Sequence, residues 1–450
     1  GTTAGLHIED TSLSSAATRT FLILVVLACV SVILWAHLRT GYFVSPVKSV
    51  MYIYGPAAVA MTALILVFLS AQIRMIASIC FVSILAALYA HEVYWQYSWR
   101  AFGANTSAAT LGMESFQGER VYPLICGQSV MRSRPDGSIV SSIALDGDPI
   151  QPLGGPANIL VKRALIGAEK KFFIGRNDQF GFNNPEGQWR AGEVEVVVLG
   201  DSFAYGADVA AGDGIPDIIR EAIGPTVNLG CGGNGPLLTL ASLREYGASL
   251  RPRTVLWIYY EGNDLPKDIV RERQSQVLRG YLDREFTQNL MARQNEVNKA
   301  ILDFIETTRQ NRSQQPTGNS PDEWFSMHNV VRLMALRITL GMRDEFSPES
   351  LALFRRVISQ AREMVESWNG RFVFVYLPAE NRFVSPTARW DSNGYRGAVL
   401  DVLRDEEIEI LDITPTLTET ENPRAFYDGH LTKGGYRRVA DRILRSLRED

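Results

Sequence analysis

The sequence predicts an α/β protein with a parallel sheet, preceded by about three membrane-spanning helices. Two patterns carry this prediction. Long uncharged runs occupy much of residues 20–100, whereas short apolar strands alternate with helical segments from residue 193 onward. Such alternation is typical of parallel strands joined by right-handed crossovers.

The composition of the 450 residues is that of a folded chain, with 46% apolar and 21% charged residues. The net charge of -4 gives no basic excess, so we predict no nucleic-acid partner. Four cysteines without a Cys-x-x-Cys pair indicate neither a disulfide scaffold nor a metal site, and no cofactor is expected. Cys126 and Cys231 would pair only in an oxidising compartment, and the sequence leaves this open.

The first hundred residues divide into a tail and three apolar runs. Residues 1–19 are small and polar, which predicts a flexible tail. Residues 20–38, 49–73 and 75–91 contain no Asp, Glu, Lys or Arg, and each run is about long enough to span a bilayer. The alternatives are a signal peptide for the first run and a buried helical core for all three. No small-residue cleavage site follows the first run, and soluble core helices rarely stay uncharged for this length.

Membrane orientation does not follow from the basic residues, which lie on both sides of the predicted spans. Three spans do place the amino terminus and the large carboxyl-terminal part on opposite sides of the membrane.

Residues 101–192 mix Gly, Pro and short apolar pieces, which predicts a loop-rich lead-in that packs on the following domain. Within it, residues 178–185 are aromatic and turn-forming. We expect them to cover one edge of the sheet.

Residues 193–450 form the predicted sheet domain. Its central strand is the β-branched run 194–199, because a strand buried on both faces is apolar throughout. A helical insertion, residues 265–342, separates the third and fourth strands. We interpret this insertion as a surface helical arm, and the alternative is a lid or a partner-docking element. The other strands are predicted at residues 226–229, 254–260, 371–377 and 408–412.

Ser202 follows the central strand in Gly200-Asp201-Ser202. Ligands bind at the carboxyl ends of the strands in open α/β sheets, so Ser202 is the candidate nucleophile. A helix-capping serine is the alternative.

A nucleophilic serine needs a base and a group that orients the base. Of the five histidines, only His430 follows the last strand of the sheet domain. Asp428 precedes it by two residues, and side chains at this spacing share a side in an extended segment. Asp412 is the alternative to Asp428 as the carboxylate that orients His430. The acidic residues after the nucleophile are interpreted as solvent-facing charges: Asp208, Asp213 and Asp217.

Oxyanion donors are expected in loops after the neighbouring strands. The glycine-rich loop 228–236 lets backbone N–H groups approach a ligand closely. Asn263 follows the third strand and offers a side-chain amide. Ordinary turns are the alternative for both.

These blocks resemble those of the SGNH (GDSL-type) hydrolases: Gly200-Asp201-Ser202, Gly233, Gly262-Asn263-Asp264, and Asp428 with His430. The resemblance implies a three-layer, flavodoxin-like sheet domain. It implies Ser202 as the nucleophile, Ser202, Gly233 and Asn263 as the oxyanion hole, and His430 and Asp428 as the rest of a triad. One residue separates Asp428 from His430 where many members have two, and this shorter spacing is similar to that of alginate O-acetyltransferase-like proteins.

Two function classes remain. The first is a membrane-anchored serine esterase or O-acyltransferase of the bacterial envelope, acting on an ester or acylated glycan from the periplasmic side of the inner membrane, as the resemblance implies. The second is a non-catalytic subunit that docks in a membrane complex through residues 20–100 or 265–342, since small residues in the second span favour helix packing.

Overall fold

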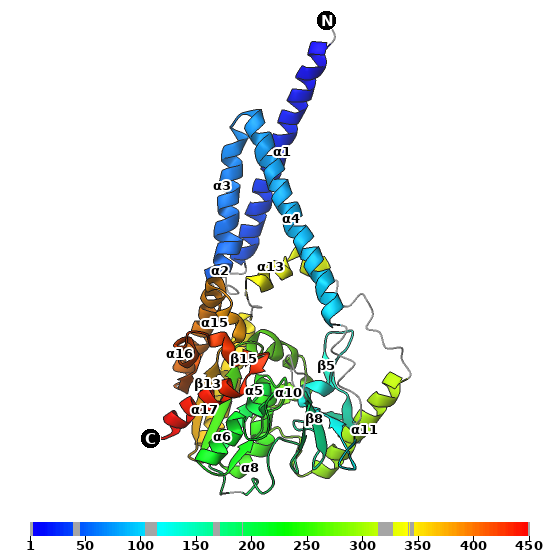
Figure 1. Ribbon diagram of the computed structural model, residues 1–450, viewed down its shortest axis with the longest axis vertical. Coiled ribbons are helices and arrows are strands. Elements are labelled where there is room, and N and C mark those ends of the chain that lie inside the picture. Colours follow the sequence, from blue (N-terminus) through cyan, green and yellow to red (C-terminus); the bar gives the residue numbers. More distant parts are fainter. Residues whose placement is uncertain are drawn as a thin grey trace. The chain divides into compact units, whose positions relative to one another are not determined.

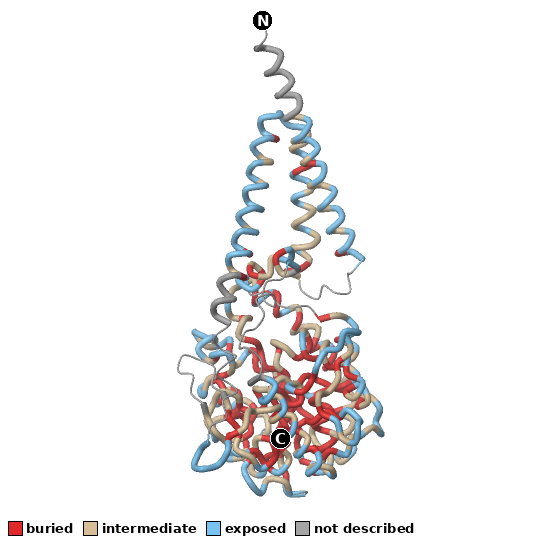
Figure 2. The backbone as a smooth tube through the Cα atoms, turned by 90° about the vertical axis from the view of Figure 1, so that its right-hand side faces the viewer, coloured by how far each residue is buried: buried red, intermediate tan, exposed pale blue. Residues whose placement is uncertain are grey.

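The computed structural model describes residues 3–38, 46–103, 115–164, 172–190, 192–313, 327–340, 342 and 346–448. The chain divides into two compact units. The first holds the described residues of 1–106, 318–345 and 384–395, and the second holds those of 107–317, 346–383 and 396–450. Figure 2 shows that the long helices of the first unit are exposed along most of their length, whereas buried residues concentrate in the second unit.

The first unit contains three helices that are long and apolar enough to cross a membrane, over residues 15–38, 46–67 and 71–96. Their number agrees with the sequence prediction. The second of them is built from α2, the π-helical turn η2 and α3. These elements form one continuous helix because Ser49 and Gly55, on either side of η2, both have right-handed helical backbone angles. The elements are α1 (Thr3–Leu38), α2 (Pro46–Ser49), η2 (Val50–Tyr54), α3 (Gly55–Val67) and α4 (Ala71–Gly103) (Figure 1).

Two boundaries differ from the prediction. Helix α1 begins at Thr3, so the expected flexible tail is helical from that residue. Extending an existing helix costs much less than nucleating one, and the long apolar run supplies the helix to extend. The break between the second and third helices lies at residues 68–70 rather than at Arg74. The Arg74 guanidinium donates to the Leu69 carbonyl at the turn and, at 2.6 Å, to Ser15 Oγ of α1, so two neutral oxygen acceptors stabilise its charge.

The second unit is built on a five-stranded sheet in the order β11-β10-β12-β13-β14, with every pair parallel. The α/β prediction is therefore confirmed. All five residues of β10 are buried, as its β-branched composition requires of a strand covered on both faces. The strands are β10 (Val196–Gly200), β11 (Thr226–Asn228), β12 (Thr254–Tyr260), β13 (Arg371–Leu377) and β14 (Glu409–Asp412).

Helices cover both faces of this sheet. On one face, Val196 and Val198 join a buried apolar cluster with α6 (Ile215–Ala222) and α17 (Lys433–Arg448). On the other, Phe354 of α14 (Pro348–Glu366) packs 5.8 Å from Tyr259 and 5.9 Å from Phe374, measured between ring centroids. Because strand residues alternate between faces, the two sets of side chains form separate layers.

The lead-in supplies short strands in small sheets outside the main one. As expected, its segment 178–185 covers a sheet edge: the Asn184 side chain accepts from Asn228 N at 2.7 Å and donates to Asn228 O at 2.9 Å on the edge strand β11. The strands are β1 (Ser115–Phe116), β2 (Glu119–Arg120), β3 (Tyr122–Pro123), β4 (Met131–Ser133), β5 (Ile139–Ser141), β6 (Ile143–Leu145), β7 (Asp148–Ile150), β8 (Leu160–Ala164) and β9 (Phe172–Arg176).

A disulfide joins Cys126 of the lead-in to Cys231 of the glycine-rich loop, 105 residues apart. The pairing that the sequence left open is thus present, while Cys29 and Cys80 are free.

Short helical elements complete both units. Residues 265–342 are largely helical where the structure describes them; residues up to 313 belong to the second unit and 327–340 to the first. The elements are η3 (Gly127–Val130), α5 (Ser202–Tyr205), α7 (Pro236–Ser242), η4 (Leu243–Gly247), α8 (Ala248–Leu250), η5 (Asp264–Asp268), α9 (Ile269–Glu272), α10 (Gln276–Gly280), α11 (Gln294–Ser313), α12 (Met327–Val331), α13 (Met334–Thr339), η7 (Glu380–Phe383), α15 (Pro386–Asp405), α16 (Thr414–Thr418) and η8 (Pro423–Phe426).

Replacing Cys126 and Cys231 together by Ala should destabilise the second unit, because closing a loop of about 100 residues stabilises a fold by about 4.7 kcal/mol in the chain-entropy treatment. We expect the thermal unfolding midpoint of the detergent-purified protein to fall by roughly 10 °C. The matched control replaces the free thiols Cys29 and Cys80 by Ala and should leave this midpoint unchanged. Equal midpoints for the two double variants would contradict a stabilising bond.

Candidate active site

Ser202 lies at the end of the central strand because Gly200 lets the chain turn there. Gly200 has φ 140°, and a Cβ at this position would lie 2.5 Å from the Ile258 carbonyl oxygen of β12. Only glycine fits such a contact. The Asp201 carboxylate then accepts from Phe203 N at 2.9 Å, which caps the four-residue helix α5 and places Ser202 in its first turn.

His430 is brought to Ser202 by a hairpin. Strands β15 (Tyr427–Asp428) and β16 (His430–Leu431) pair through a turn at Gly429, where φ is 79°. The His430 Nε2 atom lies 2.8 Å from Ser202 Oγ. The structure thus brings together the serine and the histidine that the sequence singled out.

The carboxylate beside His430 is Asp208, not Asp428. Asp208 Oδ2 lies 2.5 Å from His430 Nδ1, and the Asp208 side chain is only 6% exposed. Its backbone has φ 62°, a left-handed conformation that Asp tolerates better than most residues. The loop after α5 therefore turns the carboxylate inward. The interpretation of Asp208 as a solvent-facing charge is wrong.

The other predicted acids take different places. Asp428 is exposed on the hairpin, and the Nδ1 atom it was expected to orient faces Asp208 instead. Asp412 pairs with Arg396. Asp213 and Asp217, by contrast, pair with Lys433 and Arg220 near the start of α6.

A sequence signal for Asp208 existed but was weak. It is a lone acidic residue between Gly206 and Gly212, in the turn that follows α5. Adjacency in sequence favoured Asp428, whereas the fold joins His430 to a residue 222 positions away.

Asn263 approaches Ser202 from the loop after β12. Its Nδ2 atom donates to Asp201 Oδ2 at 3.2 Å, directly beside Ser202 in the chain. This loop is fixed by Glu261, whose buried carboxylate accepts from Ala379 N at 2.8 Å and pairs with Arg382 at 2.5 Å. The amide is therefore held on a rigid support.

Gly233 lies in the glycine-rich loop with φ 77°, and a Cβ here would lie 2.3 Å from Gln128 Oε1. The loop is tethered on both sides of Gly233. The disulfide holds Cys231, and the Glu272 carboxylate accepts from Gly235 N at 2.7 Å and Leu237 N at 2.8 Å. Its backbone donors are thus preorganised rather than mobile.

Four buried carboxyls surround this loop and the start of α5: Asp201, Asp264, Asp268 and Glu272. Burial raises the pKa of Asp201 to about 6 and that of Asp268 to about 7. Burial, reinforced by the neighbouring acids, raises the pKa of Asp264 and Glu272 well above the ordinary range. Holding protons limits the negative charge that accumulates beside the site.

These acids do not form a metal centre. Among the described residues, no group of three or more His, Cys, Asp or Glu side chains is arranged to hold an ion. The Glu272 carboxylate instead accepts from the backbone N–H groups of Gly235 and Leu237, so its role is structural.

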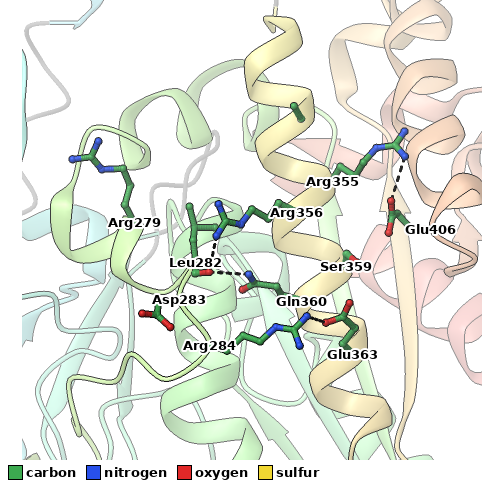
Figure 3. A pocket seen from close by; sticks show the side chains of 11 residues that line it. Arg279, Leu282, Asp283, Arg284, Arg355, Arg356, Ser359, Gln360, Glu363 and Glu406 are labelled. Atoms are coloured by element: carbon green, nitrogen blue, oxygen red, sulfur yellow. Dashed lines mark hydrogen bonds and ion pairs between the residues drawn. The ribbon is translucent and has the colours of Figure 1, made fainter.

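A groove of about 970 Å³ lies elsewhere in the second unit, between α14 and the chain after α10 (Figure 3). Its arginines are largely engaged within the protein: Arg284 pairs with Glu363, Arg355 with Glu406, and Arg356 donates to Leu282 O. None of Ser202, Asp208 and His430 lines it. The groove is therefore not the binding site of the candidate nucleophile.

No family model and no curated protein matches the chain. Solved structures similar to it include a member of the lipolytic protein G-D-S-L family from Veillonella parvula, 13% identical, covering 56% of this chain and 97% of that chain with a TM-score of 0.30. Another is the lipase/acylhydrolase from Enterococcus faecalis, 13% identical over 56% and 95% with a TM-score of 0.30. A third is the psychrotrophic esterase EstA from Pseudoalteromonas sp., 10% identical over 57% and 97% with a TM-score of 0.28. The G-D-S-L family is the one that the sequence motifs resemble. At these identities and TM-scores, the candidate site rests on contacts within this chain alone.

The raised pKa of Asp268 predicts a pH-dependent stability. The folded protein keeps this proton up to about pH 7, whereas the unfolded chain releases it near pH 4. The folded state therefore binds more protons across this window, and the stabilisation is lost as pH rises through 7. Asp268→Asn should reduce the fall of the thermal midpoint between pH 5 and pH 8, while the exposed Asp428→Asn should not. An undiminished fall in Asp268→Asn would show that other groups set the pH dependence.

Proposed function

We propose that the chain is a membrane-anchored serine esterase or O-acyltransferase that works through an acyl-serine intermediate. One observation carries the proposal: His430 lies between Ser202 Oγ, at 2.8 Å, and Asp208 Oδ2, at 2.5 Å. A serine hydroxyl is a weak nucleophile at neutral pH, and a base oriented by a carboxylate is what activates it.

In the first half of the reaction, His430 Nε2 takes the proton of Ser202 while Ser202 Oγ attacks the ester carbonyl carbon. Asp208 accepts from His430 Nδ1–H, which keeps Nε2 free as the acceptor and stabilises the imidazolium that forms. The tetrahedral intermediate collapses when its C–O bond to the alcohol breaks, and His430 returns the proton to the departing oxygen. The acyl group remains on Ser202.

The negative charge on the carbonyl oxygen needs donors, and three are proposed: the backbone N–H groups of Ser202 and Gly233, and the Asn263 amide. Rigid donors are worth the most, since they need no reorganisation during the reaction. The buried Glu261–Arg382 pair, the disulfide and Glu272 support this role because they fix the two loops.

In the second half, an acceptor hydroxyl attacks the acyl-serine with His430 again as the base. Water as the acceptor gives hydrolysis, and a sugar hydroxyl gives transfer. An acetylated envelope glycan is the substrate class proposed, on the resemblance of the sequence to alginate O-acetyltransferase-like proteins.

The proposed location is a bacterial inner membrane, crossed by the three apolar helices, with the second unit on the periplasmic side and the amino terminus in the cytoplasm. Two observations support it. The helices are long and apolar enough to cross a membrane. The Cys126–Cys231 disulfide suits an oxidising compartment, where such bonds persist.

Reaction of the detergent-purified protein with a fluorophosphonate tests the nucleophile. We expect one covalent adduct by intact mass in the wild type and none in Ser202→Ala or His430→Ala, because the serine needs its base. The exposed Ser367→Ala is the matched control and should label like the wild type. Absence of labelling in a folded wild type would oppose an activated serine and favour a non-catalytic subunit of a membrane complex.

The choice of carboxylate is tested by comparing Asp208→Asn with Asp428→Asn. Asp208→Asn should lower kcat for p-nitrophenyl acetate by on the order of 10³- to 10⁴-fold, because the amide favours the wrong imidazole tautomer. Asp428→Asn should stay within about twofold of wild type, since an exposed charge contributes little. Thermal midpoints check that both variants fold. A large loss confined to Asp428→Asn would reverse the assignment.

A further inference from the structure

Exposed large apolar side chains are unevenly distributed in the chain beyond the three apolar helices. Among the described residues after position 96, seven such side chains are exposed, and six of them lie in two short segments, 327–340 and 384–390. The six are Met327, Val331, Ile338, Leu340, Val384 and Trp390, with exposures from 36% to 65%. The seventh is Phe116 of the lead-in.

Both segments belong to the same compact unit as the apolar helices. They also contact each other, since Ser385 Oγ donates to Leu340 O at 3.1 Å. The two segments thus form one surface, which we call the juxtamembrane surface.

Buried polar contacts attach this surface to one end of the helical bundle. The Glu92 carboxylate of α4 is fully buried and accepts from Ala335 N at 2.8 and 2.9 Å, which caps α13. Arg337 donates to the Tyr52 hydroxyl at 3.2 Å, and the buried Lys48 ammonium contacts the Tyr395 hydroxyl.

These contacts identify which end of the bundle is involved. Lys48 and Tyr52 lie in the first turns of the second apolar helix, and Glu92 lies in the last turns of the third. Because α3 and α4 form a hairpin, the start of one and the end of the other lie at the same end, where Figure 1 places α13 near both helices. Lys48 and Glu92 are buried here, whereas the six apolar side chains are exposed.

The exposed side is suited to a lipid–water boundary. Met327 and Val331 are four residues apart and share a face of α12. Trp390 follows the exposed Arg389, and aromatic rings together with long basic side chains are enriched at membrane interfaces. Helices α12 and α13 have five and six residues, too few to cross a bilayer.

We propose that the juxtamembrane surface lies in the headgroup layer of the membrane, with these six side chains inserted among phospholipids. The surface continues the lipid-facing surface of the helices to which it is attached. The inference rests on the proposal that the three helices cross a membrane, but it assigns a lipid-binding role to residues far along the sequence from any of them.

Single cysteines carrying an environment-sensitive fluorophore test this in the full-length protein, with Cys29 and Cys80 replaced by Ala. Reporter positions are Val331→Cys, Ile338→Cys and Trp390→Cys. The matched control is Phe116→Cys in the second unit, where the native side chain is 45% exposed, close to the 46% of Trp390 and the 48% of Ile338. Leu64→Cys on α3 reports the membrane span. Each variant is reconstituted in phosphatidylcholine–phosphatidylglycerol vesicles and exposed to aqueous iodide or to lipids spin-labelled near the headgroup or near the chain terminus.

We expect labels at 331, 338 and 390 to be quenched several-fold more strongly than the label at 116 by lipid spin-labelled near the headgroup, and to be shielded from iodide. The label at 64 should respond to lipid spin-labelled near the chain terminus.

Three results would overturn the inference. Quenching by iodide equal to that at 116 would place the surface in water. Shielding from iodide without lipid quenching would mean that a protein partner or a second copy covers it. Loss of lipid quenching at 64 as well would reject the membrane span itself, whereas a normal response at 64 confines the failure to this inference.

Discussion

Strand β10 lies between β11 and β12, and its parallel pairing with both sets the geometry of the site. Parallel strands end at one edge, so the residues that follow β10 and β12 meet there. Ser202 and Asn263 approach each other for this reason, through Asp201. The close contact of Gly200 with the Ile258 carbonyl is the local condition, because any side chain at Gly200 would push the two strands apart.

The sequence predicted best the positions of residues that lie in the strands of the sheet or directly follow them. The strands could be predicted because a strand buried on both faces is apolar throughout. The approach of Ser202 to His430 could be predicted because both residues follow strands of the sheet domain. Asp208 was not predictable in this way. Its carboxylate reaches His430 only because the chain adopts a left-handed conformation at that residue, and charge alone suggested a surface position. The Cys126–Cys231 pair similarly depends on a tertiary approach that spacing does not encode.

The buried acids around the site show how the fold keeps a polar edge from becoming too negative. Burial penalises the charged forms of these acids and raises the pKa of Asp268 to about 7, so Asp268 keeps part of its proton near neutrality. Several ionised carboxylates in one poorly solvated region would otherwise repel one another. The same carboxyls brace the loops, since Glu272 and Asp201 accept backbone N–H groups at helix starts. Structural support and electrostatic restraint thus come from the same groups.

The disulfide between the lead-in and the glycine-rich loop has a consequence for the order of assembly. Cys126 leaves the ribosome 105 residues before Cys231, so the lead-in is made early but cannot be fastened until two strands of the main sheet have been synthesised. During that interval its thiol is available to other partners. The bond can therefore form only after the early cysteine has stayed unpaired through the synthesis of both strands, and until then the lead-in is not covalently joined to the glycine-rich loop.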